Sequence, residues 1–163
     1  MRIAALVSGG VDSSVMVPIL KEQGYDPHIF YIKIGLEGKD DLMDCPSEED
    51  IEITTFIAKK YGCKFDIVDL QKEYYDRVAS YTMDSVRKGL TPNPDVMCNR
   101  MIKFGAFEEK IGYQFDRIAT GHYAKIVDGK LYKASDKNKD QSYFLAYVNK
   151  DVFKEVLFPL QDI

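Results

Sequence analysis

Short apolar runs alternate along the chain with longer stretches whose apolar residues recur at helical spacing. Residues 3–7 form a continuous apolar run, which predicts a strand covered on both faces, and further strands are predicted at 28–34, 65–70 and 116–120. The helical stretches, each followed by a glycine, are 12–23, 47–61 and 71–88. Because strands alternate with helices, the sequence predicts an α/β fold, with a mostly parallel sheet and helices on both faces.

Glycine and proline positions predict several local features. Asp128 and Gly129 lie between two short strand-like runs and predict a β-hairpin. Two prolines disfavour helix across 91–95, so we expect the next helix to start near Asn99. Pro18 lies inside the first predicted helix and predicts a kink there.

Length and composition narrow the class of protein. The chain has 163 residues, which fits one domain, and 45% of them are hydrophobic. Its net charge of −4 argues against a protein that coats nucleic acid through bulk positive charge. No apolar run approaches the length of a membrane span, and three widely spaced cysteines disfavour a disulfide framework or a zinc site. Together these features predict a cytoplasmic protein with no membrane partner.

The first predicted strand leads into a glycine-rich turn, SGGVDSS at residues 8–14, that opens a helix. Glycines let a phosphate approach the backbone, and a helix start offers unpaired N–H groups. Asp12 can hold a divalent cation or cap the helix. The lysine of a Walker loop is missing. We interpret the turn as a phosphate site; the alternative is an ordinary strand-to-helix turn with Asp12 as its N-cap.

The SGGVDS sequence resembles the signature of the N-type ATP pyrophosphatases, which have an adenine nucleotide alpha hydrolase-like fold. These enzymes split ATP between its α and β phosphates and adenylate a substrate. Three further segments, 91–105, 119–124 and 136–145, make the chain similar to tRNA-specific 2-thiouridylases. The resemblance implies that residues 1–163 are the ATP-pyrophosphatase catalytic domain, whose relatives continue into tRNA-binding parts that carry a second cysteine.

The resemblance implies ATP-dependent replacement of the 2-oxygen of the wobble uridine of tRNA by sulfur. AMP is transferred to the uracil oxygen, and sulfur then displaces AMP. The implied cofactors are ATP and magnesium, and the implied partners are tRNA and a persulfide sulfur donor protein. The predicted nucleotide-binding residues are Leu6, Val7, Ser8, Gly9, Gly10, Val11, Asp12, Ser13, Ile32 and Gly121, with Asp12 also predicted to hold the metal. The residues predicted to contact tRNA are Asn93, Pro94, Asp95, Lys139, Asp140 and Gln141.

Cys98 is the predicted nucleophile, and the resemblance gives it the task of releasing sulfur from a persulfide. It precedes the expected helix start, and Arg100 and Lys103 follow it, so we expect a lowered thiol pKa. Asp95 is the nearest carboxylate and could act as acid or base. Cys45, in an acidic loop, and Cys63, before a strand, are predicted not to be catalytic.

Structural alternatives stay open for several of these residues. Cys98 and Ile32 could be core residues, and Asp95 could form a turn after Pro94. The segment 139–141 could be a polar loop that caps the next helix, and His122 could be structural. At the level of function, the alternatives are a non-catalytic or truncated ATP-binding module, or another adenylating enzyme on the same loop.

Overall fold

A computed structural model describes residues 1–35 and 47–163 of the chain and contains a five-stranded sheet. Its strands are β1 Ile3–Leu6, β2 His28–Lys33, β3 Phe65–Asp69, β4 Arg117–Thr120 and β7 Val156–Leu157. They lie in the order β3-β2-β1-β4-β7, and all neighbouring pairs are parallel. A separate antiparallel hairpin joins β5 Ala124–Val127 to β6 Lys130–Lys133.

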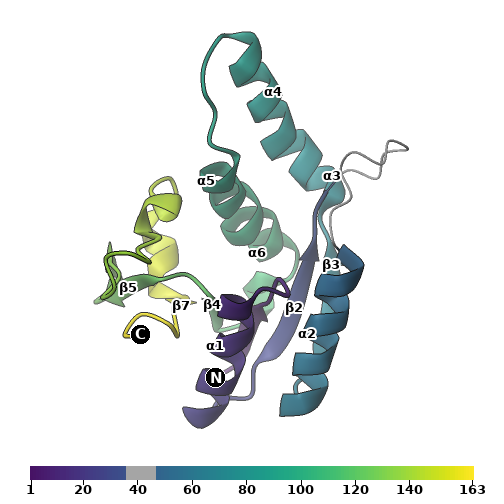
Figure 1. The fold of residues 1–163 in the computed structure, drawn as a ribbon, viewed down its shortest axis with the longest axis vertical. Coiled ribbons are helices and arrows are strands. Elements are labelled where there is room, and N and C mark those ends of the chain that lie inside the picture. Colours follow the sequence, from purple (N-terminus) through teal and green to yellow (C-terminus); the bar gives the residue numbers. More distant parts are fainter. Residues whose placement is uncertain (36–46) are drawn as a thin grey trace.

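Helices of three kinds connect these strands. The α-helices are α1 Val11–Glu22, α2 Ser47–Tyr61, α3 Gln71–Tyr74, α4 Ser80–Arg87, α5 Pro94–Cys98 and α6 Phe107–Lys110. Two π-helical segments continue them: η2 Tyr75–Ala79, between α3 and α4, and η3 Asn99–Ala106, between α5 and α6. The short 3₁₀ segments are η4 Gly112–Gln114, η5 Ser142–Leu145 and η6 Lys150–Lys154. Helix α4 extends away from the sheet (Figure 1).

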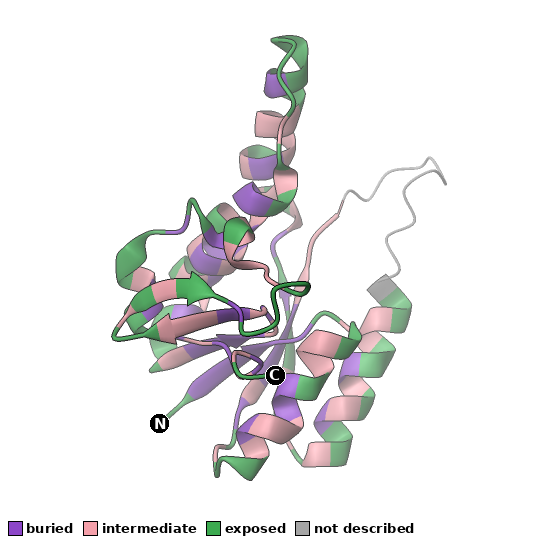
Figure 2. Ribbon diagram, turned by 60° about the vertical axis from the view of Figure 1, so that its left-hand side comes forward, coloured by how far each residue is buried: buried purple, intermediate pink, exposed green. Residues whose placement is uncertain are grey.

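The central strands β1 and β4 are buried on both faces, as the continuous apolar run at 3–7 predicts for β1, whereas most of the edge strand β3 is exposed (Figure 2). Alternate residues of β1 face opposite sides: Ile3 and Ala5 belong to one apolar core, and Ala4 and Leu6 to the other. The first core is completed by α1 and α2, and the second by η2, η3 and α6. The α/β prediction, with a parallel sheet between two helical layers, is confirmed.

The predicted hairpin is also confirmed. Asp128 and Gly129 both have positive φ, 52° and 70°, as a two-residue turn matching the twist of the flanking strands requires. The helix predicted over 71–88 exists, but it contains the π-helical turn η2, which the apolar spacing did not reveal. Helix α1 stays helical through Pro18, and nothing in the structure explains the choice of proline there.

The prediction that residues 91–95 are non-helical is wrong at its C-terminal end. Helix α5 starts at Pro94, because proline is tolerated at the first helical position, where no intrahelical bond from its nitrogen is needed. Asn93 caps this helix, since its side chain accepts a hydrogen bond of 3.2 Å from the Val96 N–H. Cys98 therefore lies inside a helix, four residues past its first residue, and not before a helix start.

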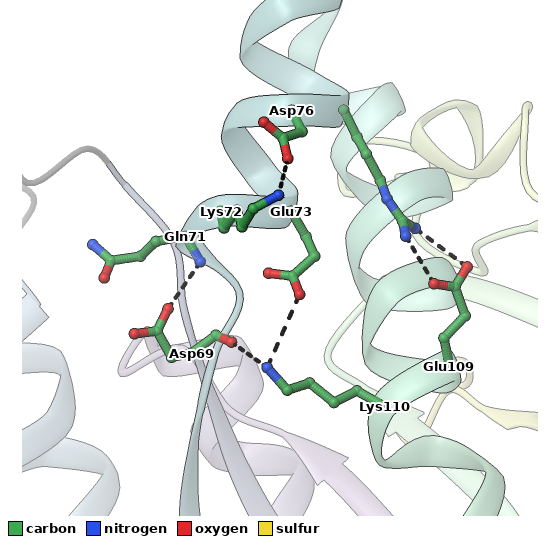
Figure 3. Close-up of polar contacts among 8 residues, drawn as sticks. Asp69, Gln71, Lys72, Glu73, Asp76, Glu109 and Lys110 are labelled. Carbon is green, nitrogen blue, oxygen red and sulfur yellow. Dashed lines mark hydrogen bonds and ion pairs between the residues drawn. The ribbon is translucent and has the colours of Figure 1, made fainter.

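The second helical layer is held together by charged groups near its base. The Arg77 guanidinium of η2 donates to both carboxylate oxygens of Glu109 in α6, at 3.2 and 2.8 Å. It also donates to the Met101 carbonyl of η3, at 3.4 Å. On the side of the sheet, Lys110 donates to the Asp69 carbonyl at 3.0 Å (Figure 3). The Arg77 side chain thus joins η2, η3 and α6.

We expect Arg77→Ala to lower the free energy of unfolding by about 1–2 kcal/mol. The change removes a bidentate ion pair with Glu109 and the bond to the Met101 carbonyl. Arg87→Ala is the matched control, because the pair between Arg87 and Asp84 is exposed and lies within one helix. Its expected change is below about 0.5 kcal/mol. Urea denaturation of both variants measures the difference, and equal losses would show that the Arg77 contacts add no stability.

Candidate nucleotide and thiol site

A cavity of about 400 Å³ opens at the C-terminal ends of β1 and β4. The chain leaves β1 toward one side of the sheet, where β2 and β3 lie, whereas β4 has β7 on its other side. Such a reversal of strand order leaves a crevice that the two diverging connections cannot fill, and ligands of open α/β sheets bind there. The cavity is lined by residues 6–8, at the end of β1, and by residues 120–122, at the end of β4.

The turn after β1 is held in shape by the Ser13 hydroxyl. Its oxygen lies 3.1 Å from the Ser8 N–H, which donates to it, and 3.1 Å from the Gly10 carbonyl, to which it donates. The Ser8 hydroxyl lies 3.1 Å from the same oxygen. Because these bonds stay within the turn, the loop conformation is set before any ligand arrives.

The three predicted glycines have different physical reasons for being glycine. Gly9 has φ +79°, and a Cβ there would lie 2.5 Å from the Asp50 carboxylate. A Cβ on Gly121 would lie 2.8 Å from the Ser13 Cα, so glycine lets the turn after β4 pack on the start of α1. A Cβ on Gly10 would meet only the Ser8 hydroxyl, at 3.7 Å. Protein packing therefore leaves the space over Gly10 open on the cavity side.

The Asp12 side chain, in the first turn of α1, is held by a residue that follows β4. The Tyr123 hydroxyl donates to it at 3.1 Å, and the Tyr123 N–H donates to the Gln141 side-chain oxygen at 3.1 Å. The Lys139 ammonium lies 5.5 Å from the centre of the Tyr123 ring. Segment 139–141 is thereby linked to the phosphate-loop carboxylate through one tyrosine.

One wall of the cavity is the helix that runs from α5 into η3. The lining residues on this wall are Asp95, Cys98, Asn99, Ile102 and Lys103. The Asn99 amide nitrogen donates to the Asp95 carbonyl at 3.0 Å, which identifies the other amide atom as its oxygen. That oxygen is buried and has no hydrogen-bond partner in the described part of the chain. A carboxylate, a thiol, an amide and an ammonium group thus share this wall.

The expected lowering of the Cys98 thiol pKa is contradicted. Burial raises the pKa of Cys98, and the nearby Lys103 charge only partly opposes this effect. Two of the predicted causes are missing: Cys98 lies beyond the first helical turn, where the helix dipole acts, and Arg100 is exposed. The pKa prediction was wrong because the helix starts at Pro94, which places Cys98 one turn later than the sequence predicted.

His122 is buried, and its ring nitrogen lies 2.7 Å from the Thr120 hydroxyl. Burial, with a smaller contribution from the Lys103 charge, lowers the pKa of His122 to about 3. Its ring also packs at 5.8 Å from the ring of Phe158. At neutral pH the imidazole is therefore uncharged and contributes shape and one hydrogen bond to the floor of the cavity.

Most of the predicted site residues line this single cavity. Those that line it are Leu6, Val7, Ser8, Gly10, Val11, Asp12, Ser13, Ile32, Asp95, Cys98, Gly121 and Gln141. Those outside its lining are Gly9, Asn93, Pro94, Lys139 and Asp140. Asp140 instead accepts from the Ala134 N–H at 2.8 Å and the Ser142 hydroxyl at 3.0 Å, which fits the loop alternative. Asn93 and Pro94 form the helix start.

Several residues that line the cavity were not predicted as site residues from the sequence. They are Phe30, Ile34, Asn99, Ile102, Thr120 and Phe144. The spacing of Asp95, Asn99 and Lys103, four residues apart, would have placed three polar groups on one helix face if the helix had been started at Pro94. The apolar members carry no such signal, because a lining phenylalanine or isoleucine looks like a core residue in the sequence.

The other cysteines have different surroundings from Cys98. Cys63 packs against the apolar core between the sheet and α1 and α2, as the core interpretation predicts. Cys45 lies outside the described residues. Within 1–35 and 47–163, no group of three or more His, Cys, Asp or Glu residues is placed to hold a metal ion. No helix in these two stretches is both long and apolar enough to cross a membrane.

Comparisons with known proteins agree along the whole chain. A family model described as the tRNA methyl transferase HUP domain matches residues 1–163. A Porphyromonas gingivalis strain W83 protein named tRNA-specific 2-thiouridylase MnmA is 62% identical over 164 residues, covering 98% of this chain and 45% of that protein. A protein of the same name from Parabacteroides distasonis is also 62% identical, covering 98% and 46%. The chain spans about half the length of these curated relatives.

The fold also has a solved counterpart. A crystal structure from Methanocaldococcus jannaschii, titled as a predicted subunit of tRNA methyltransferase, has a TM-score of 0.57 and 20% sequence identity. It covers 100% of this chain and 69% of its own chain, and at this identity it shows the fold alone. With a family model that matches from the first residue to the last, the chain belongs to the tRNA methyl transferase HUP domain family.

Proposed function

We propose that this chain carries the adenylation and thiol site of an enzyme that makes 2-thiouridine at the wobble position of tRNA. The observation that supports this most is that the glycine-rich turn after β1 and a cysteine share one cavity. Thiolation requires both, because the uracil 2-oxygen is a poor leaving group until it carries AMP. The names of the most similar relatives, tRNA-specific 2-thiouridylases, support the same reaction.

We assign ATP to the part of the cavity that β1, α1 and Gly121 enclose. The polyphosphate would lie over Gly10, where no protein atom needs the space, and would meet the Ser8 and Ser13 hydroxyls. The adenine would lie against Ile32, at the end of β2. Asp12 is the carboxylate best placed to hold a magnesium ion on the phosphates, and magnesium would neutralise charge and polarise the α-phosphate.

The target uridine would enter beside the wall that carries Asp95 and Cys98. Asp95 is within the cavity and can exchange a proton with the base, while Cys98 is the thiol that meets an incoming persulfide. Asn93, Pro94 and segment 139–141 lie outside the lining and would contact the rest of the tRNA. A persulfide sulfur donor protein is the proposed partner, and the cytoplasm is the proposed location.

Residues 1–163 are proposed as the catalytic domain of a longer enzyme, because the relatives that they match are about twice as long. Within the described residues only Cys98 lines the cavity, whereas Cys63 packs in the core on the opposite face of the sheet. Release of sulfur from a persulfide by thiol attack needs two cysteines in bonding reach. The second thiol would therefore come from outside this part of the molecule.

We expect Asp12→Ala to weaken magnesium-dependent ATP binding at least tenfold, because the carboxylate that holds the ion is lost. Ser14→Ala is the matched control: Ser14 is in the same helical turn, does not line the cavity, and should change the affinity less than twofold. Isothermal titration calorimetry measures both. In EDTA the Asp12 variant should bind ATP no worse than the parent, since a bare carboxylate repels phosphate. Equal affinities in magnesium would count against this site.

Free sulfide should separate the roles of adenylation and sulfur delivery. With tRNA, ATP, magnesium and sulfide, we expect the chain to form 2-thiouridine, and Cys98→Ser to keep most of this activity, because sulfide itself can displace AMP. Asp12→Ala should lose it at least tenfold. With a persulfide donor in place of sulfide, we expect no catalytic turnover. Nucleoside analysis of the digested tRNA, together with measurement of pyrophosphate, provides the readout.

Cys63→Ser is the control for both sulfur sources and should match the parent, because Cys63 lies away from the cavity. Pyrophosphate release that ignores tRNA and yields no modified uridine would point to another adenylating enzyme. ATP binding without any pyrophosphate would point to a binding module that does not catalyse. Catalytic turnover with the persulfide donor would show that the chain is sufficient and that no second thiol from elsewhere is needed.

A further inference from the structure

The π-helical segment η3 changes which side chains share a face with Cys98. In an α-helix, residues five apart point roughly 140° away from each other. A π-helical turn closes over five residues, so residue i+5 returns toward the face of residue i. The wide turn is visible in the hydrogen bonds, since the Phe107 N–H donates to the Ile102 carbonyl, five residues back. Lys103 precedes Phe104, the one residue of this segment without helical φ/ψ, and lines the same cavity as Cys98.

Glycine at position 105 makes this wide turn possible. A Cβ on Gly105 would lie 2.9 Å from the Arg100 carbonyl oxygen, which is also five residues back. The Met101 carbonyl in the same turn accepts a hydrogen bond from Arg77 of η2. The turn is therefore built into the packing of the helical layer, and π-helical turns of this kind occur frequently at functional sites.

Among the described residues that line the cavity, Lys103 is also the only lysine or arginine. Arg100, the other basic residue near Cys98, is exposed outside the lining. An ammonium group that is largely removed from water costs free energy unless a nearby anion compensates for it. Cys98 as a thiolate and the Asp95 carboxylate are the anions that can do so.

We propose that Lys103 is the positioning residue for the nucleophile: its ammonium group, on the same cavity wall as Cys98, opposes the effect of burial and favours ionisation of the Cys98 thiol. This inference rests on the proposed function only for the use to which the thiolate is put. The shared wall itself is a property of the described helix. It explains how a cysteine whose burial disfavours ionisation can still serve as a nucleophile.

Three other titratable groups line the cavity together with Cys98 and Lys103. Asp95 of α5 lies on the same wall, Asp12 of α1 lines the opposite part of the cavity, and His122 follows β4. His122 is uncharged because its pKa is about 3, so it does not compete with Cys98 for the ammonium charge. Burial lowers the pKa of Lys103, whereas Cys98 and Asp95 raise it, in agreement with a mutual dependence of the amine and the thiol.

The test is the pH dependence of Cys98 alkylation by iodoacetamide, with neither ATP nor tRNA present. Peptide mass spectrometry gives the rate at Cys98 and, as an internal control, at Cys63. We expect Lys103→Met to move the midpoint of the Cys98 profile up by about one pH unit or more, which is about tenfold slower labelling at neutral pH. Lys103→Arg, which keeps the charge, should restore most of the rate. Cys63 should be unchanged in every variant.

A thiolate absorbance titration near 240 nm, read as the difference between each protein and its Cys98→Ser derivative, gives the same midpoint without a reagent. Thermal unfolding checks that the variants fold, and Lys103→Gln replaces Lys103→Met if the latter does not. Unchanged Cys98 profiles in the neutral variants would overturn the proposal. If the neutral variants also weaken ATP binding in calorimetry, Lys103 serves the nucleotide instead. If the Cys98 profile shifts upward as expected but the parent chain forms no 2-thiouridine from free sulfide, only the proposed function is contradicted.

Discussion

The reversal of strand order between β1 and β4 is the constraint on which the site depends. Since the chain leaves β1 and β4 toward opposite sides, the ends of these central strands are not covered by their own connections. The β1 end supplies the glycine-rich turn, and the β4 end supplies Gly121 and His122. Gly121 has to be glycine because the two turns touch: its Cα lies against the backbone of Ser13. The floor of the cavity is therefore a packing contact between two strand ends.

Another wall of the cavity comes from the helix that runs from α5 into η3, which is not a regular α-helix. Asp95, Asn99 and Lys103 are four residues apart, so the helix from Pro94 places all three on the wall that also carries Cys98. The irregular turn leaves backbone carbonyls in need of donors, and Arg77 satisfies one of them, at Met101. The Arg77 side chain joins η2, η3 and α6, and its bond to Met101 supports the same helical segment that carries Lys103. The stability of the fold and the chemistry of the site are therefore coupled.

The sequence predicted the sheet and failed at the helix that matters most for the thiol. Continuous apolar strands and terminal glycines are local signals, so β1–β4, α1, α2 and the Asp128–Gly129 hairpin followed from them. The helix start at Pro94 was missed because two prolines were weighed as helix breakers, although proline fits the first helical position. The π-helical turns depend on tertiary packing, which spacing cannot reveal. The predicted Cys98 pKa was wrong in direction because burial, a tertiary property, outweighs nearby charge.

The predicted tRNA-contacting segment and the phosphate turn are not independent parts of the structure. Gln141 accepts from the Tyr123 N–H, and the Tyr123 hydroxyl donates to Asp12. A carboxylate that holds a magnesium ion must turn its oxygens toward the metal, so ion binding would compete with or reorient the bond from Tyr123. Tyr123 is also held by the Lys139 ammonium over its ring. The Asp12 carboxylate and the segment predicted to contact tRNA are therefore linked through a single tyrosine.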